Sequence, residues 1–152
     1  MADLALVVKF SAALAEVSGV TVTANGWNTR IDGWGCAPDG CVAANVLDKS
    51  IAPESRWACR PSRSEVEVCE LTFVFDEPQD IFEIRMAMFK GNERNRTVNI
   101  WVDGLLSSTV VTSATTLELE AYELSATQAS TIVLQEAGAE ENVWLSITEV
   151  SL

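Results

Sequence analysis

Histidine is absent from this 152-residue chain. Its absence removes the commonest general base and the usual zinc ligand, and it excludes hydrolytic triads that depend on histidine. Tyrosine occurs once, as Tyr122. An enzyme would have to use this phenol, or a carboxylate pair such as Glu65 and Glu67, as its acid and base. We therefore expect no enzymatic activity and assign no catalytic residue.

Positive charge is scarce as well. The chain has 10 Lys and Arg against 22 Asp and Glu, which gives a formal net charge of -12. This balance disfavours nucleic acid as a partner, because neutralising phosphates needs clustered basic residues in excess. All the basic residues lie between Lys9 and Arg96. Any cationic site must therefore be built from the middle of the chain.

The chain also lacks an apolar run long enough to span a bilayer. Residues 1–18 are expected to form an N-terminal extension, either a weak signal-like segment or a linker, because Asp3 and Lys9 interrupt the pattern of a signal peptide. Residues 19–152 are expected to form one domain. An apolar content of 48% is sufficient for a hydrophobic core of that size.

Four cysteines are present, and they form two close pairs along the chain, Cys36 with Cys41 and Cys59 with Cys69. An even count at short separations is typical of disulfides in an oxidising, extracellular compartment. The alternative is a four-cysteine zinc site, but these spacings lack the two-to-four-residue knuckles that such sites use. Adjacent disulfides would staple residues 27–63, a segment rich in Gly, Pro, Asp and Asn that we expect to be a loop with one helical turn at 43–47.

Alternation of apolar and polar residues dominates the rest of the chain and predicts about eight β-strands. Asp103-Gly104 predicts a hairpin turn, and Glu77-Pro78 is expected to end a strand. The sequence predicts an all-β domain, an antiparallel β-sandwich or jelly roll. The expected strands are 20–24, 66–75, 81–89, 97–102, 105–112, 117–124, 131–135 and 143–150.

Three motifs carry a family resemblance. They are Ala44-Asn45-Val46-Leu47-Asp48 with Ser55-Arg56-Trp57, the stretch 84–94 with 98–102, and Trp144-Leu145-Ser146-Ile147-Thr148-Glu149-Val150. Together they resemble the discoidin-like (coagulation factor five/eight type C) domains, especially the carbohydrate-binding modules associated with polysaccharide lyases. The resemblance covers roughly residues 19–152. It implies a β-sandwich that binds carbohydrate without catalysing a reaction.

The resemblance also implies a structural calcium ion between the first loop and the last strand. Oxygen donors from carboxylates, hydroxyls and carbonyls are what this hard cation prefers. The sequence departs from the family pattern where Lys49 replaces a glycine and where the loop is about two residues longer. A hydrogen-bonded turn from Asp48 to Ser55 is the alternative. By position, the ligands would be the carbonyls of Asn45, Ser50 and Thr148, the carboxylates of Asp48 and Glu149, and the Ser55 hydroxyl or carbonyl.

The same resemblance places the sugar-binding surface in loops. A basic loop after residue 89 offers guanidinium forks, which bind carboxylates or sulfates. Arg60 and Arg63 could join it, whereas surface ion pairs with Glu54, Glu65 and Glu93 are the alternative. Trp57 and Trp144 are expected in the core or behind the metal loop, whereas Trp101 could either be structural in this way or stack on a sugar ring. The candidate ligand-binding residues are Lys90, Asn92, Arg94, Arg96 and Arg56, with Trp27 and Trp34 for stacking on a sugar ring.

The leading hypothesis is thus a secreted, non-catalytic carbohydrate-binding module with a structural calcium. Its expected ligand is a polysaccharide, and the basic loop favours an acidic one, uronate or sulfated. The module is expected to be part of a larger multidomain protein. The alternatives are an adhesion or lipid-headgroup-binding discoidin module, with Ile51 and Trp34 as apolar contacts, and a structural domain of an extracellular assembly.

Overall fold

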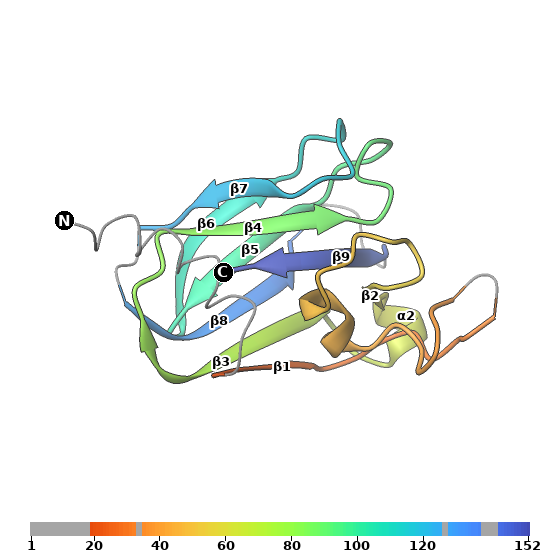
Figure 1. The fold of residues 1–152 in the computed structure, drawn as a ribbon, viewed down its shortest axis with the longest axis horizontal. Helices are drawn as coiled ribbons and strands as arrows, with labels where there is room; N and C mark the ends of the chain where they lie inside the picture. The colour runs from red at the N-terminus through yellow and green to blue at the C-terminus, as the bar shows by residue number, and fades with distance from the viewer. Residues whose placement is uncertain (1–18, 33–34, 126–127, 138–142) are drawn as a thin grey trace.

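The computed structural model describes residues 19–32, 35–125, 128–137 and 143–152, and within them nine strands form two sheets (Figure 1). A 3-10 helix, η1, and a single helical turn, α2, lie among them. No helix in these ranges is both long and apolar enough to cross a membrane. The elements are β1 (Val20–Ala24), η1 (Ala43–Leu47), β2 (Trp57–Cys59), α2 (Pro61–Ser64), β3 (Glu70–Gln79), β4 (Glu83–Met88), β5 (Thr97–Val102), β6 (Leu105–Val111), β7 (Glu120–Glu123), β8 (Ala129–Glu136) and β9 (Leu145–Ser151).

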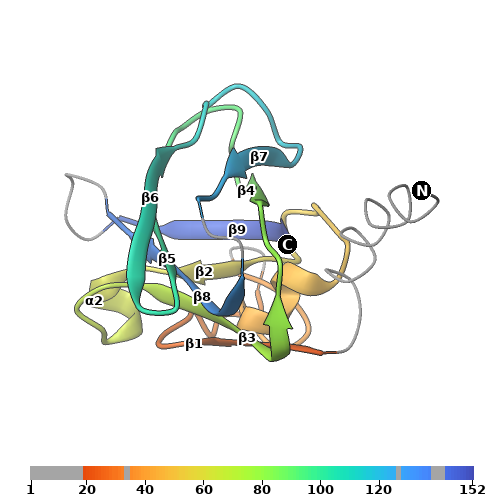
Figure 2. The same cartoon turned by 90° about the vertical axis from the view of Figure 1, so that its left-hand side faces the viewer.

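The sheets are layered as a sandwich (Figure 2). One has the strand order β1-β3-β8-β5-β6 and the other β2-β9-β4-β7. All neighbouring strands are antiparallel. The predicted all-β, antiparallel sandwich is therefore confirmed.

The core lies between the sheets and is built from alternate residues of each strand. Phe73 and Ile132 face inward from the five-stranded sheet, and Met86 and Ile147 from the four-stranded one; all four are fully buried. Each such side chain contributes about 1.5–3 kcal/mol through removal of apolar surface from water. Trp57 is also fully buried, and its Nε1 donates to the Gly26 carbonyl at 2.9 Å, which satisfies the one polar group of the ring.

The predicted hairpin at Asp103-Gly104 is confirmed. Both residues have positive φ, 48° and 83°, as the two-residue turn between twisted strands requires. Asp103 Oδ1 accepts the backbone N–H groups of Ser130 and Thr131, each at 2.8 Å. These bonds hold the pKa of Asp103 below its usual value and tie the hairpin to β8.

The structure corrects several predicted elements. The segment 27–63 contains β2 and the first three residues of α2 in addition to the predicted helical turn. Strand β3 begins later than predicted and continues through Pro78, which lies where the β3–β8 register shifts between Val74 and Gln79; proline is tolerated at such irregularities because no ladder hydrogen bond is lost. Phe82, which lies within the expected strand 81–89, precedes β4 and is 62% exposed.

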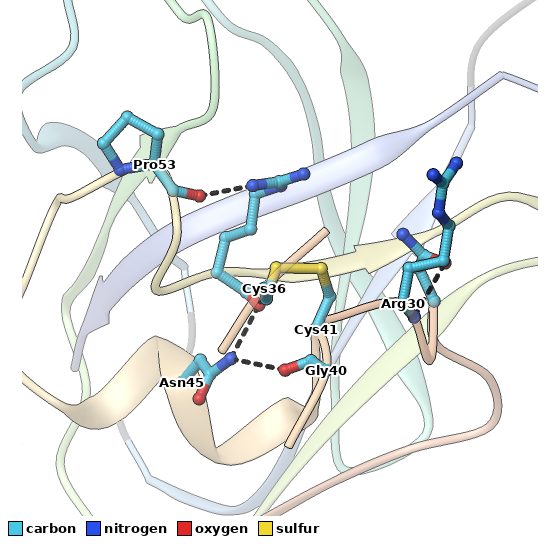
Figure 3. Close-up of a disulfide and its surroundings, with 8 residues drawn as sticks. Arg30, Cys36, Gly40, Cys41, Asn45 and Pro53 are labelled. Carbon is cyan, nitrogen blue, oxygen red and sulfur yellow. Dashed lines mark hydrogen bonds between the residues drawn. A yellow bond between two sulfur atoms is a disulfide. The ribbon is translucent and has the colours of Figure 1, made fainter. Parts of the chain in front are cut away.

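Both predicted disulfides form. Cys36 is bonded to Cys41 and Cys59 to Cys69, with Cα–Cα distances of 4.9 and 5.9 Å. All four sulfurs are thereby used, which rules out the four-cysteine zinc alternative. The second bridge joins β2 to the residue before β3, and the first closes the loop beside η1 (Figure 3).

Candidate functional site

A pocket of about 550 Å³ opens where β2, β9 and β4 meet the loops around them. These strands are neighbours in one sheet, so the ends of the segments around residues 56, 89 and 144 come together. Phe89 donates its backbone N–H to the Ser146 carbonyl at 3.0 Å. Among the described residues that line the pocket, none is acidic and six are basic: Arg30, Arg56, Arg60, Arg63, Lys90 and Arg94.

Arg56 is the most buried cation of the pocket, only 8% exposed. It immediately precedes β2, and its Cζ lies 4.1 Å from the centroid of the Phe89 ring, within cation–π distance. Its Nη1 donates to the Pro53 carbonyl, whereas its buried Nε has no hydrogen-bond partner. Burial lowers the pKa of Arg56, and the charge of Glu54 partly opposes this shift. The side chain still carries its charge, because arginine is not deprotonated in proteins.

Arg94 approaches the same ring from the loop between β4 and β5, with Cζ 5.6 Å from the Phe89 centroid. Burial and then the charge of Arg96 lower its pKa, and Arg56 adds to this repulsion. Its Nε is likewise buried without a hydrogen-bond partner. Two guanidinium groups thus contact one phenyl ring, and each has a buried Nε without a hydrogen-bond partner.

The rim of the pocket is partly neutralised by ion pairs. Arg30 Nη2 lies 2.6 Å from Asp32 Oδ2, and Lys90 Nζ lies 3.7 Å from Glu93 Oε2. All four side chains are more than 40% exposed, and ion pairs of this kind are weak and readily exchanged. Of the ion pairs expected with Glu54, Glu65 and Glu93, the one between Lys90 and Glu93 is formed.

The structure brings together part of the predicted ligand-binding set. Lys90, Arg94 and Arg56 all line the pocket, as do Arg60 and Arg63. These five residues come from two separate segments of the chain, 56–63 and 90–94.

The remaining predicted residues lie elsewhere or are not described. Asn92 is exposed on the same loop but does not line the pocket. Arg96 donates from Nε to the Trp144 carbonyl at 2.8 Å and from Nη1 to the Asn95 carbonyl at 2.7 Å, so it braces the rim. Trp27 is 42% exposed and also lies outside the lining. Trp34 falls outside the described residues.

Six lining residues were not assigned to the site from the sequence: Asn28, Arg30, Ala58, Phe89, Trp144 and Ser146. Trp144 was expected in the core or behind the metal loop. It is half-buried, packs against Ala58 and the Cys36–Cys41 bridge, and forms one wall of the pocket. Phe89 ends the segment predicted as a strand, and its position directly before Lys90 was the available signal. Arg30 carried no signal beyond its charge.

The predicted cation loop is folded around Asp48. Its Oδ1 accepts the Ser50 backbone N–H at 3.0 Å, and its Oδ2 accepts the Ser55 hydroxyl. Glu149 of β9 lies against this carboxylate, close enough for each acidic side chain to alter the pKa of the other. The structure thus places Asp48, Ser50, Ser55 and Glu149 side by side.

The side chains of the two other predicted ligands bond elsewhere. Asn45 Nδ2 donates to the carbonyls of Gly40 at 3.1 Å and Arg56 at 2.9 Å, and Figure 3 shows this amide reaching toward Gly40 beside the disulfide. Thr148 donates its hydroxyl to the Ala87 carbonyl at 3.0 Å. It lies where the β4–β9 register shifts, between Ile147 and Glu149. For both residues the main-chain carbonyl was the predicted donor.

Glu149 provides the strongest indication that this loop binds a cation. It is 7% exposed, and burial together with the negative charge of Asp48 raises its pKa to about 7. Burial also raises the pKa of Asp48. Backbone N–H groups of residues 49, 50 and 150 favour the charged form of Glu149, yet its Oε2 has no hydrogen-bond partner. Two adjacent carboxylates with an unpartnered buried oxygen need a proton or a cation.

The donor set is compatible with a hard cation. The described residues hold no cluster of three or more His, Cys, Asp or Glu side chains. A cation would therefore rely on two carboxylates, with hydroxyl and main-chain oxygens completing its shell, which is chemistry that calcium accepts.

Comparison with known proteins identifies the fold but gives no match by sequence family. No protein-family model and no curated protein matches this chain. The family 32 carbohydrate-binding module (CBM32) of AlyQ, in complex with 4,5-unsaturated mannuronic acid, is 25% identical, with a TM-score of 0.68 over 88% of this chain and 93% of that module. A pectin-binding module is 24% identical, with a TM-score of 0.67 over 88% of both chains.

Two further structures extend the comparison. The family 32 module of C. perfringens NanJ, in complex with galactose, is 14% identical, with a TM-score of 0.60 over 86% of this chain and 90% of that one. This chain also spans 31% of a truncated AlyQ that has CBM32 and alginate lyase domains. The predicted resemblance in fold is confirmed.

Proposed function

Because the chain has the discoidin-like β-sandwich fold of family 32 carbohydrate-binding modules, we propose that it is a non-catalytic module that binds an acidic polysaccharide. The ligand class we favour is a uronate polymer, with a sulfated glycan as the closest chemical variant. The binding site is the cationic pocket around Phe89. The module would act outside the cell as part of a larger protein, for which the two disulfides and the 31% coverage of truncated AlyQ are the support.

One observation carries this proposal. A protein with a formal net charge of -12 gathers six basic side chains, and no acidic one among the described lining residues, around a single pocket. A buried guanidinium group with an unpartnered N–H donor costs folding free energy, unless an anion accepts a hydrogen bond from it. A sugar carboxylate can accept two parallel N–H bonds from one such group, and Trp144 supplies an apolar wall for the ring.

The relatives support the same ligand class. One was solved with an unsaturated mannuronic acid and another is named for pectin binding, and both are uronate ligands. We also propose a structural calcium at the Asp48–Glu149 loop, supported by the orphaned Glu149 oxygen. A role in catalysis is disfavoured because burial raises the pKa of Tyr122 to about 12, which makes this phenol a poor general base near neutral pH.

The test is calorimetric titration with trimannuronate and trigalacturonate, with galactose as the neutral comparison. We expect a uronate trimer to bind more tightly than galactose, and Arg94→Ala to weaken uronate binding about tenfold or more, through loss of charge-assisted hydrogen bonds. Arg85→Ala is the matched control, since Arg85 pairs with Glu83 at 2.7 Å on β4 and does not line the pocket. Equal loss in both variants, or tighter binding of galactose, would reject the proposal.

A further inference from the structure

The segment 48–56 belongs to both candidate sites. Asp48 and Ser55 form the cation loop, and Arg56, the next residue, is the most buried cation of the pocket. The two candidate sites are therefore built in part from one continuous segment of the chain. The inference drawn from this arrangement rests on the proposed function of the pocket.

The position of the Arg56 side chain depends on the main chain of this loop. Its Nη1 donates to the Pro53 carbonyl, three residues earlier. The loop is closed by the Ser55 hydroxyl on Asp48 and by the Ser55 N–H on the Ala52 carbonyl at 2.9 Å. A shift of Asp48 or Ser55 would therefore move the acceptor that holds the guanidinium group against Phe89.

The other end of the loop is held against a buried carboxylate. Glu149 is more than nine-tenths buried, and its carboxylate interacts with Asp48 and with the backbone N–H groups of residues 49 and 50. Its Oε2 has no hydrogen-bond partner. When both acids are ionised, Asp48 and Glu149 repel each other. A cation between them converts this repulsion into attraction and holds the loop closed.

We propose that a divalent, oxygen-preferring cation at Asp48 and Glu149 raises the affinity of the pocket for an anionic glycan by fixing Arg56 in its binding position. The cation would thus regulate ligand binding as well as stabilise the fold. Coupling of this kind is reciprocal, so the glycan must tighten cation binding by the same factor.

The coupling is measured by titrating trimannuronate into the protein in millimolar calcium and in EDTA. Calcium also binds uronates in solution, so a change in affinity with calcium is not informative by itself. For each protein, the affinity in calcium is therefore divided by the affinity in EDTA. The informative quantity is the quotient of this ratio for the wild type and the same ratio for Asp48→Asn. We expect this quotient to be about fivefold or more, the usual range of coupling between sites. Arg63→Ala is the matched control, because Arg63 lines the pocket from α2 but lies outside the loop. Its affinity should fall while its calcium-to-EDTA ratio stays that of the wild type.

Thermal unfolding with and without calcium provides a second readout, since a cation that binds the folded state raises the unfolding temperature. Calcium could raise the unfolding temperature of the wild type while the quotient of the affinity ratios stays near one. That result would overturn the coupling but leave the proposed glycan-binding function intact. No calcium-dependent rise would overturn it as well. Absence of binding of both trimannuronate and trigalacturonate, with and without calcium, would refute the proposed function itself. If Asp48→Asn does not fold, Ser55→Ala, which removes the hydroxyl that holds Asp48, replaces it.

Discussion

At the scale of single residues, Phe89 organises the candidate binding site. Its ring contacts the guanidinium groups of both Arg56 and Arg94, and this attraction offsets part of the repulsion between the two cations. Aromatic faces stabilise such cations by about 0.5–2 kcal/mol each. The ring thus contacts two positive charges whose Nε atoms are buried and have no hydrogen-bond partner.

Asp103 offers a residue-scale test of the fold that does not involve the pocket. Its pKa is held down by N–H groups of Thr131 and Ser130, so the charged form stabilises the folded state. This contribution is present above the ordinary aspartate pKa and is lost as the pH falls through the lower, folded-state pKa. We expect Asp103→Asn to be less stable than the wild type at neutral pH, with the difference in denaturation midpoint closing in acid.

Urea denaturation of both proteins across this pH range measures the effect. Asp80→Asn, a change in an exposed acidic residue of the β3–β4 connection, controls for the loss of one negative charge. A gap between wild type and Asp103→Asn that is constant with pH would show that the Asp103 hydrogen bonds do not depend on its ionisation.

At the scale of elements, the short disulfide supports the pocket wall. Trp144 and Ala58 pack against Cys36 and Cys41, and both line the pocket. Replacing these two cysteines with serine should cost about 2 kcal/mol of unfolding free energy, the loop-entropy value for so short a loop. It should also weaken trimannuronate binding, because the wall loses its backing.

The second disulfide provides the matched control for this prediction. Cys59 and Cys69 lie in the main core, so their replacement should cost about 3 kcal/mol with a smaller loss of affinity. Denaturant unfolding and calorimetric titration of both double variants give the two quantities. Unchanged affinity after loss of the Cys36–Cys41 bridge would show that the wall stands without it.

Sequence periodicity predicted most strands because each has one face in the core and one outside it. Strand β5 alternates in this way, with Val98, Ile100 and Val102 buried. Strand β2 has three residues that are all buried, and α2 is a single turn, so neither leaves a periodic signal. Phe82 shows the opposite error, in which a strand is predicted to extend too far. This apolar residue continues the alternating pattern of β4, but it lies just before the strand begins.

Only part of the candidate site was predicted, because the sequence groups residues that are close along the chain and not those that the fold brings together. Lys90 and Arg94 are close in sequence and could be grouped directly. Arg30 and Trp144 reach the pocket only through the order of strands and the packing of loops, which local patterns do not encode. For the cation loop, the family resemblance predicted that Asp48 and Glu149, which are far apart in sequence, lie together. The structure places their carboxylates close to each other.

At the scale of the whole molecule, charge is strongly segregated. Six of the ten basic residues line one pocket, while the rest of the surface carries the acidic excess. An acidic polymer would be repelled by most of this surface and attracted at one place, which favours a single orientation of the ligand. The cation loop lies beside that place and joins it through one short segment.

The most direct test of this account is a crystal structure of the protein with trimannuronate in the presence of calcium. The account predicts a sugar carboxylate within hydrogen-bond distance of the Arg56 and Arg94 guanidinium groups, with the ring beside Trp144. Trimannuronate bound at another face, or bound in the pocket with its carboxylates turned away from both arginines, would contradict it.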